Sequence, residues 1–125
     1  MKRILIVEDE EQICHIYRAM LLGKVEFFEA GSVESAEKLI NETNAFDLVV
    51  MDASIPYFDD GVPDRTPITI RLVKKLRHTG YFGPIIATSG DEESQKLLMI
   101  AGCSHQVSKP NISQIVMLVR ELLEL

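Results

Sequence analysis

The chain has 125 residues, which is enough for one domain with a buried core. Hydrophobic residues make up 46% and charged residues 26%, as in an ordinary globular protein, and the net charge of −6 argues against nonspecific binding to nucleic acid or to an anionic membrane. No apolar run approaches the roughly 20 residues that span a bilayer, so we predict a cytoplasmic protein with no direct membrane or nucleic-acid contact.

Apolar residues recur along the chain with two alternating periods. Short apolar runs are typical of strands, and apolar residues spaced three and four apart are typical of one helix face. In chain order, the predicted elements are strand 4–7, helix 13–21, strand 25–28, helix 33–40, strand 48–51, helix 70–76, strand 84–88, helix 92–101, strand 106–108 and helix 112–123. Ser32 is the expected N-cap of the second helix, and Asn111 with Gln114 resembles a capping box before the fifth.

The strict alternation of strands and helices predicts a mostly parallel sheet built from βαβ units. Right-handed crossovers place helices on both faces of such a sheet. The runs 4–7, 48–51 and 84–88 lack polar alternation, which fits strands that are covered on both sides. Because ligands of these sheets bind outside the carboxyl ends of the strands, we expect the functional residues there.

The cysteines and histidines do not form a metal-binding motif. Cys14 and Cys103 lie far apart, without a CxxC pair, and are interpreted as reduced structural thiols. His15, His78 and His105 are scattered along the chain, so we expect none of them to bind a metal.

Charged and hydroxyl side chains follow four of the five predicted strands. They are Glu8 and Asp9 after the first strand, Asp52 after the third, Ser89 after the fourth and Lys109 after the fifth. Three carboxylates at one edge would repel one another and raise one another's pKa values. Mg²⁺ relieves this repulsion, since it binds carboxylate oxygens and completes its shell with water and phosphate oxygens. Lys109 and Ser89 are suited to an anion, so the set predicts a phosphoryl site around a metal.

The set Glu8-Asp9, Asp52, Ser89 and Lys109-Pro110, in this order on alternating strands and helices, resembles the receiver domain of two-component response regulators. Each piece alone has an ordinary explanation, such as an acidic helix start or a surface lysine. All four at the strand ends form a specific pattern. The resemblance covers the whole chain and implies a single receiver domain, 1–125, with the flavodoxin-like (βα)5 fold and a parallel sheet in the order 2-1-3-4-5.

The resemblance also implies how the acidic residues act. Asp52 would be the phosphoacceptor, and a sensor histidine kinase or histidine phosphotransfer protein would be the donor. Asp9, Asp52 and the backbone carbonyl of Ser54 would bind Mg²⁺, or Mn²⁺ in its place, with Glu8 acting mostly through water.

Ser89 matches the family's switch position, and Lys109 matches the lysine of its Lys-Pro motif. The domain would take part in its own phosphorylation and dephosphorylation without being a conventional enzyme. Phosphorylation would switch its docking to a downstream protein target, which the sequence does not name.

Three other classes of protein are weighed against this interpretation. A haloacid dehalogenase-type phosphatase would have a second Asp two residues after Asp52, where Ser54 stands. A flavodoxin would have a Ser/Thr-rich phosphate loop after the first strand, where residues 8–11 are acids. A pseudo-receiver that serves only as a protein-interaction module stays open as the main alternative.

Three features depart from the family pattern, and the mildest is the serine at the switch position, Ser89, which is a conservative change. The stretch 53–67 is longer than the family's usual loop and contains Asp59, Asp60 and Asp64, so it could gate the site, select the kinase or be a tolerated surface insertion. Gln106 stands where the family has an aromatic ring. Because a buried amide needs hydrogen-bond partners, we expect the loops after the third and fourth strands, more than Gln106, to rearrange on phosphorylation.

Overall fold

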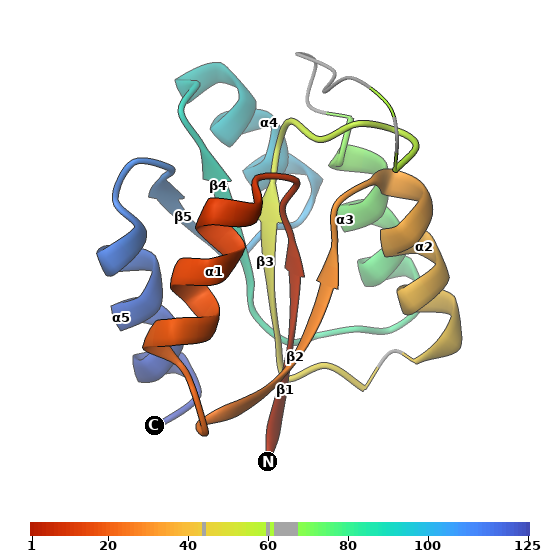
Figure 1. Ribbon diagram of the computed structural model, residues 1–125. Coiled ribbons are helices and arrows are strands. Elements are labelled where there is room, and N and C mark those ends of the chain that lie inside the picture. The colour runs from red at the N-terminus through yellow and green to blue at the C-terminus, as the bar shows by residue number, and fades with distance from the viewer. Residues whose placement is uncertain (44, 60, 62–67) are drawn as a thin grey trace.

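The computed structural model describes residues 1–43, 45–59, 61 and 68–125. Strands and helices alternate along the chain as predicted (Figure 1). In chain order, the elements are β1 (Lys2–Val7), α1 (Glu11–Met20), β2 (Val25–Ala30), α2 (Val33–Glu42), β3 (Leu48–Asp52), α3 (Ile70–His78), β4 (Ile85–Ser89), α4 (Glu92–Ala101), β5 (His105–Ser108) and α5 (Ile112–Leu122). Most boundaries lie within two residues of those expected from the sequence.

The strands form a five-stranded sheet in the order β2-β1-β3-β4-β5. All four neighbouring pairs are parallel, with Ile4 opposite Leu48 and Val49 opposite Ile85 in the central pairs. The predicted flavodoxin-like topology is therefore confirmed. All the strands end at the same edge, at the top of Figure 1, where the turn from β1 to α1 and the loop after β3 lie.

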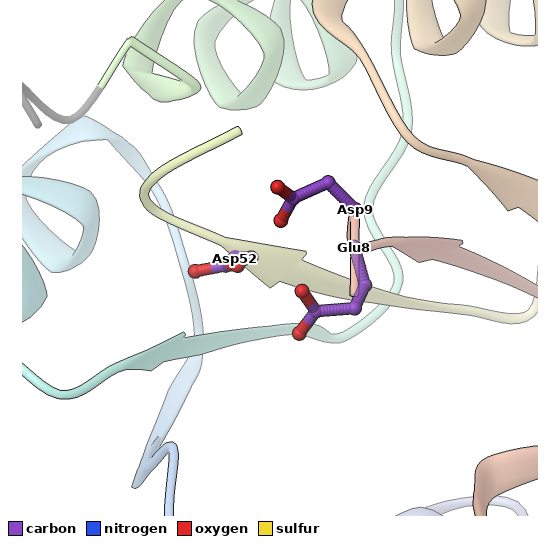
Figure 2. Close-up of side chains that lie close together, drawn as sticks. All are labelled: Glu8, Asp9 and Asp52. Carbon is purple, nitrogen blue, oxygen red and sulfur yellow. The ribbon is translucent and has the colours of Figure 1, made fainter. Parts of the chain in front are cut away.

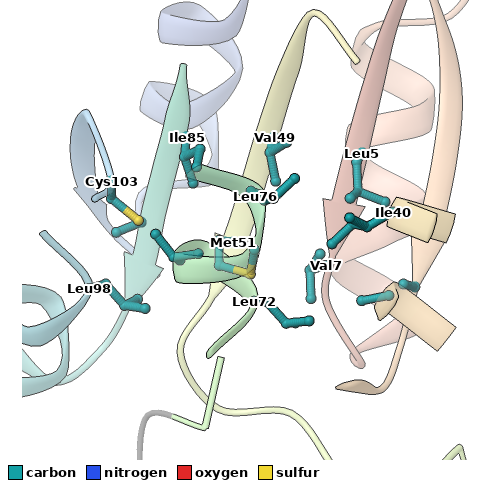
Figure 3. Packing of buried hydrophobic residues seen from close by; sticks show 14 of the residues in the cluster. Leu5, Val7, Ile40, Val49, Met51, Leu72, Leu76, Ile85, Leu98 and Cys103 are labelled. Carbon is teal, nitrogen blue, oxygen red and sulfur yellow. The ribbon is translucent and has the colours of Figure 1, made fainter. Parts of the chain in front are cut away.

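Helices α2, α3 and α4 cover one face of the sheet. Leu5, Met51 and Ile85 of the strands pack there against Leu72 of α3 and Leu98 of α4, and all five are fully buried (Figure 3). Replacing such a Leu or Ile by Ala typically costs about 2–5 kcal/mol of stability, because a cavity remains.

Helices α1 and α5 cover the opposite face. Ile4, Ile6 and Val50 of the strands pack there with Tyr17 of α1 and Val116 of α5. Successive residues of a strand point to opposite faces. The run 4–7 therefore supplies apolar side chains to both layers, which is why it lacks polar alternation.

Of the two helix N-caps predicted from the sequence, one is confirmed and the other is wrong. Ser32 caps α2, since its hydroxyl oxygen accepts from the backbone N–H of Ser35 at 3.0 Å. The capping box expected at Asn111 and Gln114 is wrong, because the Asn111 side chain makes no cap hydrogen bond. The backbone carbonyl of Asn111 accepts from the Gln114 N–H at 3.0 Å instead, so the main chain closes this turn.

The loop from Ala53 to Thr69, here the β3–α3 loop, is described at residues 53–59, 61, 68 and 69. The predicted contributions of Asp60 and Asp64 lie outside the described residues. Within the part of the chain that is described, no helix is long and apolar enough to cross a membrane.

Candidate functional site

Three carboxylates meet at the carboxyl edge of the sheet. Glu8 and Asp9 follow β1, and Asp52 is the last residue of β3, which lies beside β1. One carboxylate oxygen from each lies within 4.8 Å of the others, and Figure 2 shows the three side chains converging. Only 4% of Glu8 and 2% of Asp52 are exposed, while Asp9 is half-buried. The structure therefore brings together the carboxylates that the sequence selected.

Lys109 supplies the positive charge of this cluster. Its Nζ lies 2.8 Å from Asp52 Oδ2, 3.3 Å from Glu8 Oε2 and 3.2 Å from Glu10 Oε1. Its backbone N–H donates to the carbonyl of Ser89 at 3.1 Å, which ties the end of β5 to the end of β4. The side chain is mostly buried and thus held over Asp52.

Burial and like charge change the protonation of the two buried acids. Burial raises the pKa of Glu8 to about 8, and the neighbouring Asp52 charge adds to this rise while Lys109 opposes it. Burial also raises the pKa of Asp52, although the hydrogen bond and charge of Lys109 and the Ser54 N–H favour its ionised form. Burial opposes the charge on Lys109, but Asp52 and Glu8 raise its pKa overall. The arrangement favours a charged Asp52–Lys109 pair beside a Glu8 that readily holds a proton.

The β3–α3 loop positions Asp52 from two sides. The Ser54 N–H donates to Asp52 Oδ1 at 3.3 Å, and the Thr69 hydroxyl donates to the Asp52 carbonyl oxygen at 2.7 Å. Thr69 is fully buried. Both ends of the loop are therefore attached to the last residue of β3.

A cavity of about 410 Å³ opens beside Asp52. Its lining residues are Asp52, Ser54, Ser89, Gly90, Asp91, Ser94 and Lys109. The Ser89 hydroxyl oxygen accepts from the Asp91 N–H at 3.0 Å, and Asp91 in turn caps α4 through the Ser94 N–H. Ser89 thus stands between Asp52 and the start of α4.

Sequence reasoning missed Glu10, Thr69 and Asp91 as parts of this site. Glu10 belongs to the acidic run after β1, but nothing local distinguishes it as a partner of Lys109. Thr69 is an ordinary polar residue before a helix, and only the folded chain brings it to Asp52. Asp91 lies two residues after Ser89, but its place before α4 does not distinguish it as a partner of the Ser89 hydroxyl.

Gln106 lies at a second cavity, between α4 and β5. This cavity has a volume of about 340 Å³ and is lined by Ser89, Gly90, Glu92, Gln95, Gln106 and Ser108. Gln95 donates from Nε2 to the Val107 carbonyl at 2.9 Å, while its buried Oε1 has no partner among the described residues. Gln95 Oε1 is therefore available as a hydrogen-bond acceptor for a side-chain amide that is buried at this cavity. The sequence did not indicate this acceptor.

The family model of the response regulator receiver domain matches residues 4–120, which is most of the chain. The chain belongs to this family. It is a receiver domain of a two-component response regulator, and this membership decides against the phosphatase and the flavodoxin. No curated protein matches the chain as a relative.

Solved structures of other response regulators share the fold of this receiver domain. The receiver domain of the Francisella response regulator 1452 has a TM-score of 0.77 and 23% identity, over 99% of this chain and 98% of that one. A CheY-like receiver domain protein from Methanospirillum hungatei JF-1 has a TM-score of 0.76 and 25% identity, over 99% and 94%. NtrX from Brucella abortus has a TM-score of 0.77 and 26% identity, and this chain covers 27% of its length.

Proposed function

We propose that this receiver domain accepts a phosphoryl group on Asp52 in a Mg²⁺-dependent reaction. The observation that carries this proposal is the Asp52 carboxylate, which is almost fully buried and lies 2.8 Å from Lys109 Nζ beside an open cavity. A carboxylate in this position can act as a nucleophile toward a group that enters the cavity, and the neighbouring Lys109 ammonium group pairs with its charge.

The donor set fits a hard divalent cation. Oxygens of Glu8, Asp9 and Asp52 lie within 4.8 Å of one another, and oxygen ligands of this kind suit Mg²⁺ or Mn²⁺. Asp9, Asp52 and the Ser54 carbonyl would hold the ion, with Glu8 acting mostly through water. When bound, the cation supplies charge neutralisation for phosphoryl oxygens.

The chain's own residues account for the rest of the reaction. A carboxylate oxygen of Asp52 forms a bond to phosphorus while the phosphorus–nitrogen bond of a phosphohistidine breaks, and the leaving imidazole takes up a proton from solvent. Lys109 Nζ balances the charge of the transferred group, and the Ser89 hydroxyl donates to it after leaving the Asp91 N–H. Water then hydrolyses the acyl phosphate, which restores the Asp52 carboxylate and releases inorganic phosphate, so the domain modifies only itself.

The partners follow from this chemistry. A sensor histidine kinase or a histidine phosphotransfer protein supplies the phosphoryl group in the cytoplasm, and a downstream protein responds to the phosphorylated state. Binding by the domain to nucleic acid or membrane has no part in this proposal, since its net charge is −6.

Phosphoramidate tests the proposal because it contains the same phosphorus–nitrogen bond as phosphohistidine. Incubation with phosphoramidate and Mg²⁺ should give a ³¹P signal on the protein that hydroxylamine removes, as expected for an acyl phosphate. EDTA should prevent its formation. A protein that acquires no such signal would act as a pseudo-receiver, and the proposed function would be wrong.

A further inference from the structure

A groove runs between α2 and the first part of the β3–α3 loop, away from the carboxylate cluster. It has a volume of about 640 Å³. Its lining residues are Glu34, Glu37, Lys38, Asn41, Glu42, Tyr57 and Phe58. The five α2 residues follow one another at spacings of three, one, three and one, so they form a single stripe along the helix. We call this feature the α2–loop groove.

Two aromatic side chains form the loop side of the α2–loop groove. Phe58 is 53% exposed, and its ring packs edge-on against Tyr57 with 4.8 Å between the ring centroids. Arg71 of α3 holds Tyr57, since its Nη1 donates to the tyrosine hydroxyl at 3.1 Å and its guanidinium lies 5.4 Å from the ring centroid. An aromatic side chain that is exposed but fixed by its neighbours is a typical anchor for a binding partner.

The charges of the groove favour a cation. Its lining contains three carboxylates and one ammonium group. Glu37 is already paired with Arg71 at 3.1 Å and Lys75 at 3.5 Å. Glu34 and Glu42 are exposed and have no ion pair within the described part of the chain. The carboxylates of Glu34 and Glu42 therefore remain available to a partner that enters the groove.

Hydrogen bonds fix the two walls of the groove relative to each other. They run from Val33 N to Pro56 O at 3.0 Å, from Glu34 N to Tyr57 O at 3.0 Å, and from Ser32 Oγ to Asp59 Oδ1 at 2.6 Å. The first amides of a helix have no partner within the helix, and here the loop satisfies two of them. The loop is thus attached to the start of α2, and the groove is formed before any partner arrives.

We propose that the α2–loop groove is a docking surface for a basic segment of a partner protein. An arginine side chain of that segment stacks its guanidinium on Phe58 and pairs with Glu34 or Glu42. Arginine fits better than lysine because its planar guanidinium both stacks on rings and forms a two-point bond with a carboxylate. None of the contacts that form this groove requires a phosphoryl group on Asp52, so the groove would remain if the proposed function were wrong.

A short peptide provides the test. The ¹⁵N-labelled domain is titrated with acetyl-Arg-Ala-Ala-Arg-amide, and in parallel with the same peptide carrying neutral citrulline in place of arginine. We expect saturable amide shifts confined to α2 and residues 56–59 with the arginine peptide, and none with citrulline. Phe58→Ala should weaken binding about fivefold or more, and Glu34→Gln about two- to fivefold.

Matched variants separate docking from general attraction to an acidic protein. Phe82→Ala removes a ring that is 91% exposed outside the groove, and Glu93→Gln removes an exposed acid of α4. Both should leave the affinity unchanged. Shifts spread over the whole acidic surface, or equal weakening by Glu93→Gln and Glu34→Gln, would overturn the proposal, as would unchanged binding in Phe58→Ala.

Discussion

Lys109 neutralises a cluster in which carboxylates outnumber cations. Its Nζ contacts Asp52, Glu8 and Glu10, and of these Asp52 and Glu8 are almost fully buried. Burial raises the pKa of Glu8, and the Asp52 charge, which one ammonium group does not fully offset, raises it further, so Glu8 retains a proton more readily than an ordinary glutamate. The carboxylates of the site therefore carry more negative charge than Lys109 neutralises. This excess is the physical basis for expecting a divalent cation.

The metal ligands can be tested one residue at a time. We expect Asp9→Asn to weaken Mg²⁺ binding about tenfold or more, because the ion loses a charged oxygen ligand. Titration calorimetry measures this affinity directly. Glu11→Gln is the control, since Glu11 is exposed at the start of α1 and lies outside the carboxylate cluster. Equal affinities in the parent and Asp9→Asn would remove Asp9 from the ligand set.

The raised pKa of Glu8 predicts a pH dependence of stability in the metal-free protein. The pKa is about 8 in the folded chain against an ordinary 4.5, so between these values the folded state binds a proton that the unfolded state releases. The free energy of unfolding should therefore fall as pH rises through this window. Glu8→Gln removes this loss, and its stability relative to the parent should rise by about 1 kcal/mol or more between about pH 5 and pH 8.5.

Urea denaturation in EDTA at the two pH values measures this difference. The exposed Glu93→Gln variant, on α4, serves as the control and should show no such change relative to the parent. A Glu8→Gln variant whose stability stays parallel to that of the parent would show that Glu8 is ionised throughout.

The β3–α3 loop links the proposed phosphoacceptor to α2. The loop begins directly after Asp52, is attached to Asp52 through Ser54 and Thr69, and is attached to α2 near Ser32. A change at Asp52 can therefore reach α2 through hydrogen bonds alone. A competing path runs through Ser89 to the cavity lined by Gln106 and Gln95, whose Oε1 has no partner within the described part of the chain.

Beryllofluoride, which mimics an acyl phosphate, distinguishes the two paths. With Mg²⁺ and beryllofluoride, we expect amide shifts at Val33 and Glu34 that persist in Gln106→Ala, because the loop transmits the change. Asp59→Ala removes the hydrogen bond from Ser32 to the loop. Because that bond is one of the links between the loop and α2, the amide shifts at Val33 and Glu34 should fall by about half or more. If Gln106→Ala abolishes the response and Asp59→Ala leaves it intact, the Gln106 and Gln95 amides carry the switch instead.

For the whole molecule, the sequence predicts the strands and the edge at which they end, because both depend on the order of residues along the chain. It does not predict the contacts that depend on how helices pack against strands. The runs 4–7 and 48–51 identify buried strands because their periodicity is local, and parallel strands must end at one edge, which brings Asp9 and Asp52 together. The pairing of Gln95 with the Val107 carbonyl has no such signal, since it depends on how α4 lies against β5.

Helix starts illustrate the same limit on a smaller scale. Ser32 was predictable as a cap because its hydroxyl bonds within its own turn. Asn111 has a suitable side chain, but it follows Pro110, and the backbone there closes the turn without it. The loop contacts that define the α2–loop groove join residues more than twenty positions apart, so no local pattern predicts them.

The central claim is that Asp52 alone accepts the phosphoryl group, and intact-protein mass spectrometry after incubation with acetyl phosphate and Mg²⁺ tests it most directly. The parent should gain a single phosphoryl group, and Asp52→Asn should gain none because an amide is not a nucleophile here. The Asp59→Asn variant, which changes an exposed acid of the nearby loop, should be labelled like the parent. An unlabelled parent, or an Asp52→Asn variant labelled as fully as the parent, would contradict this account.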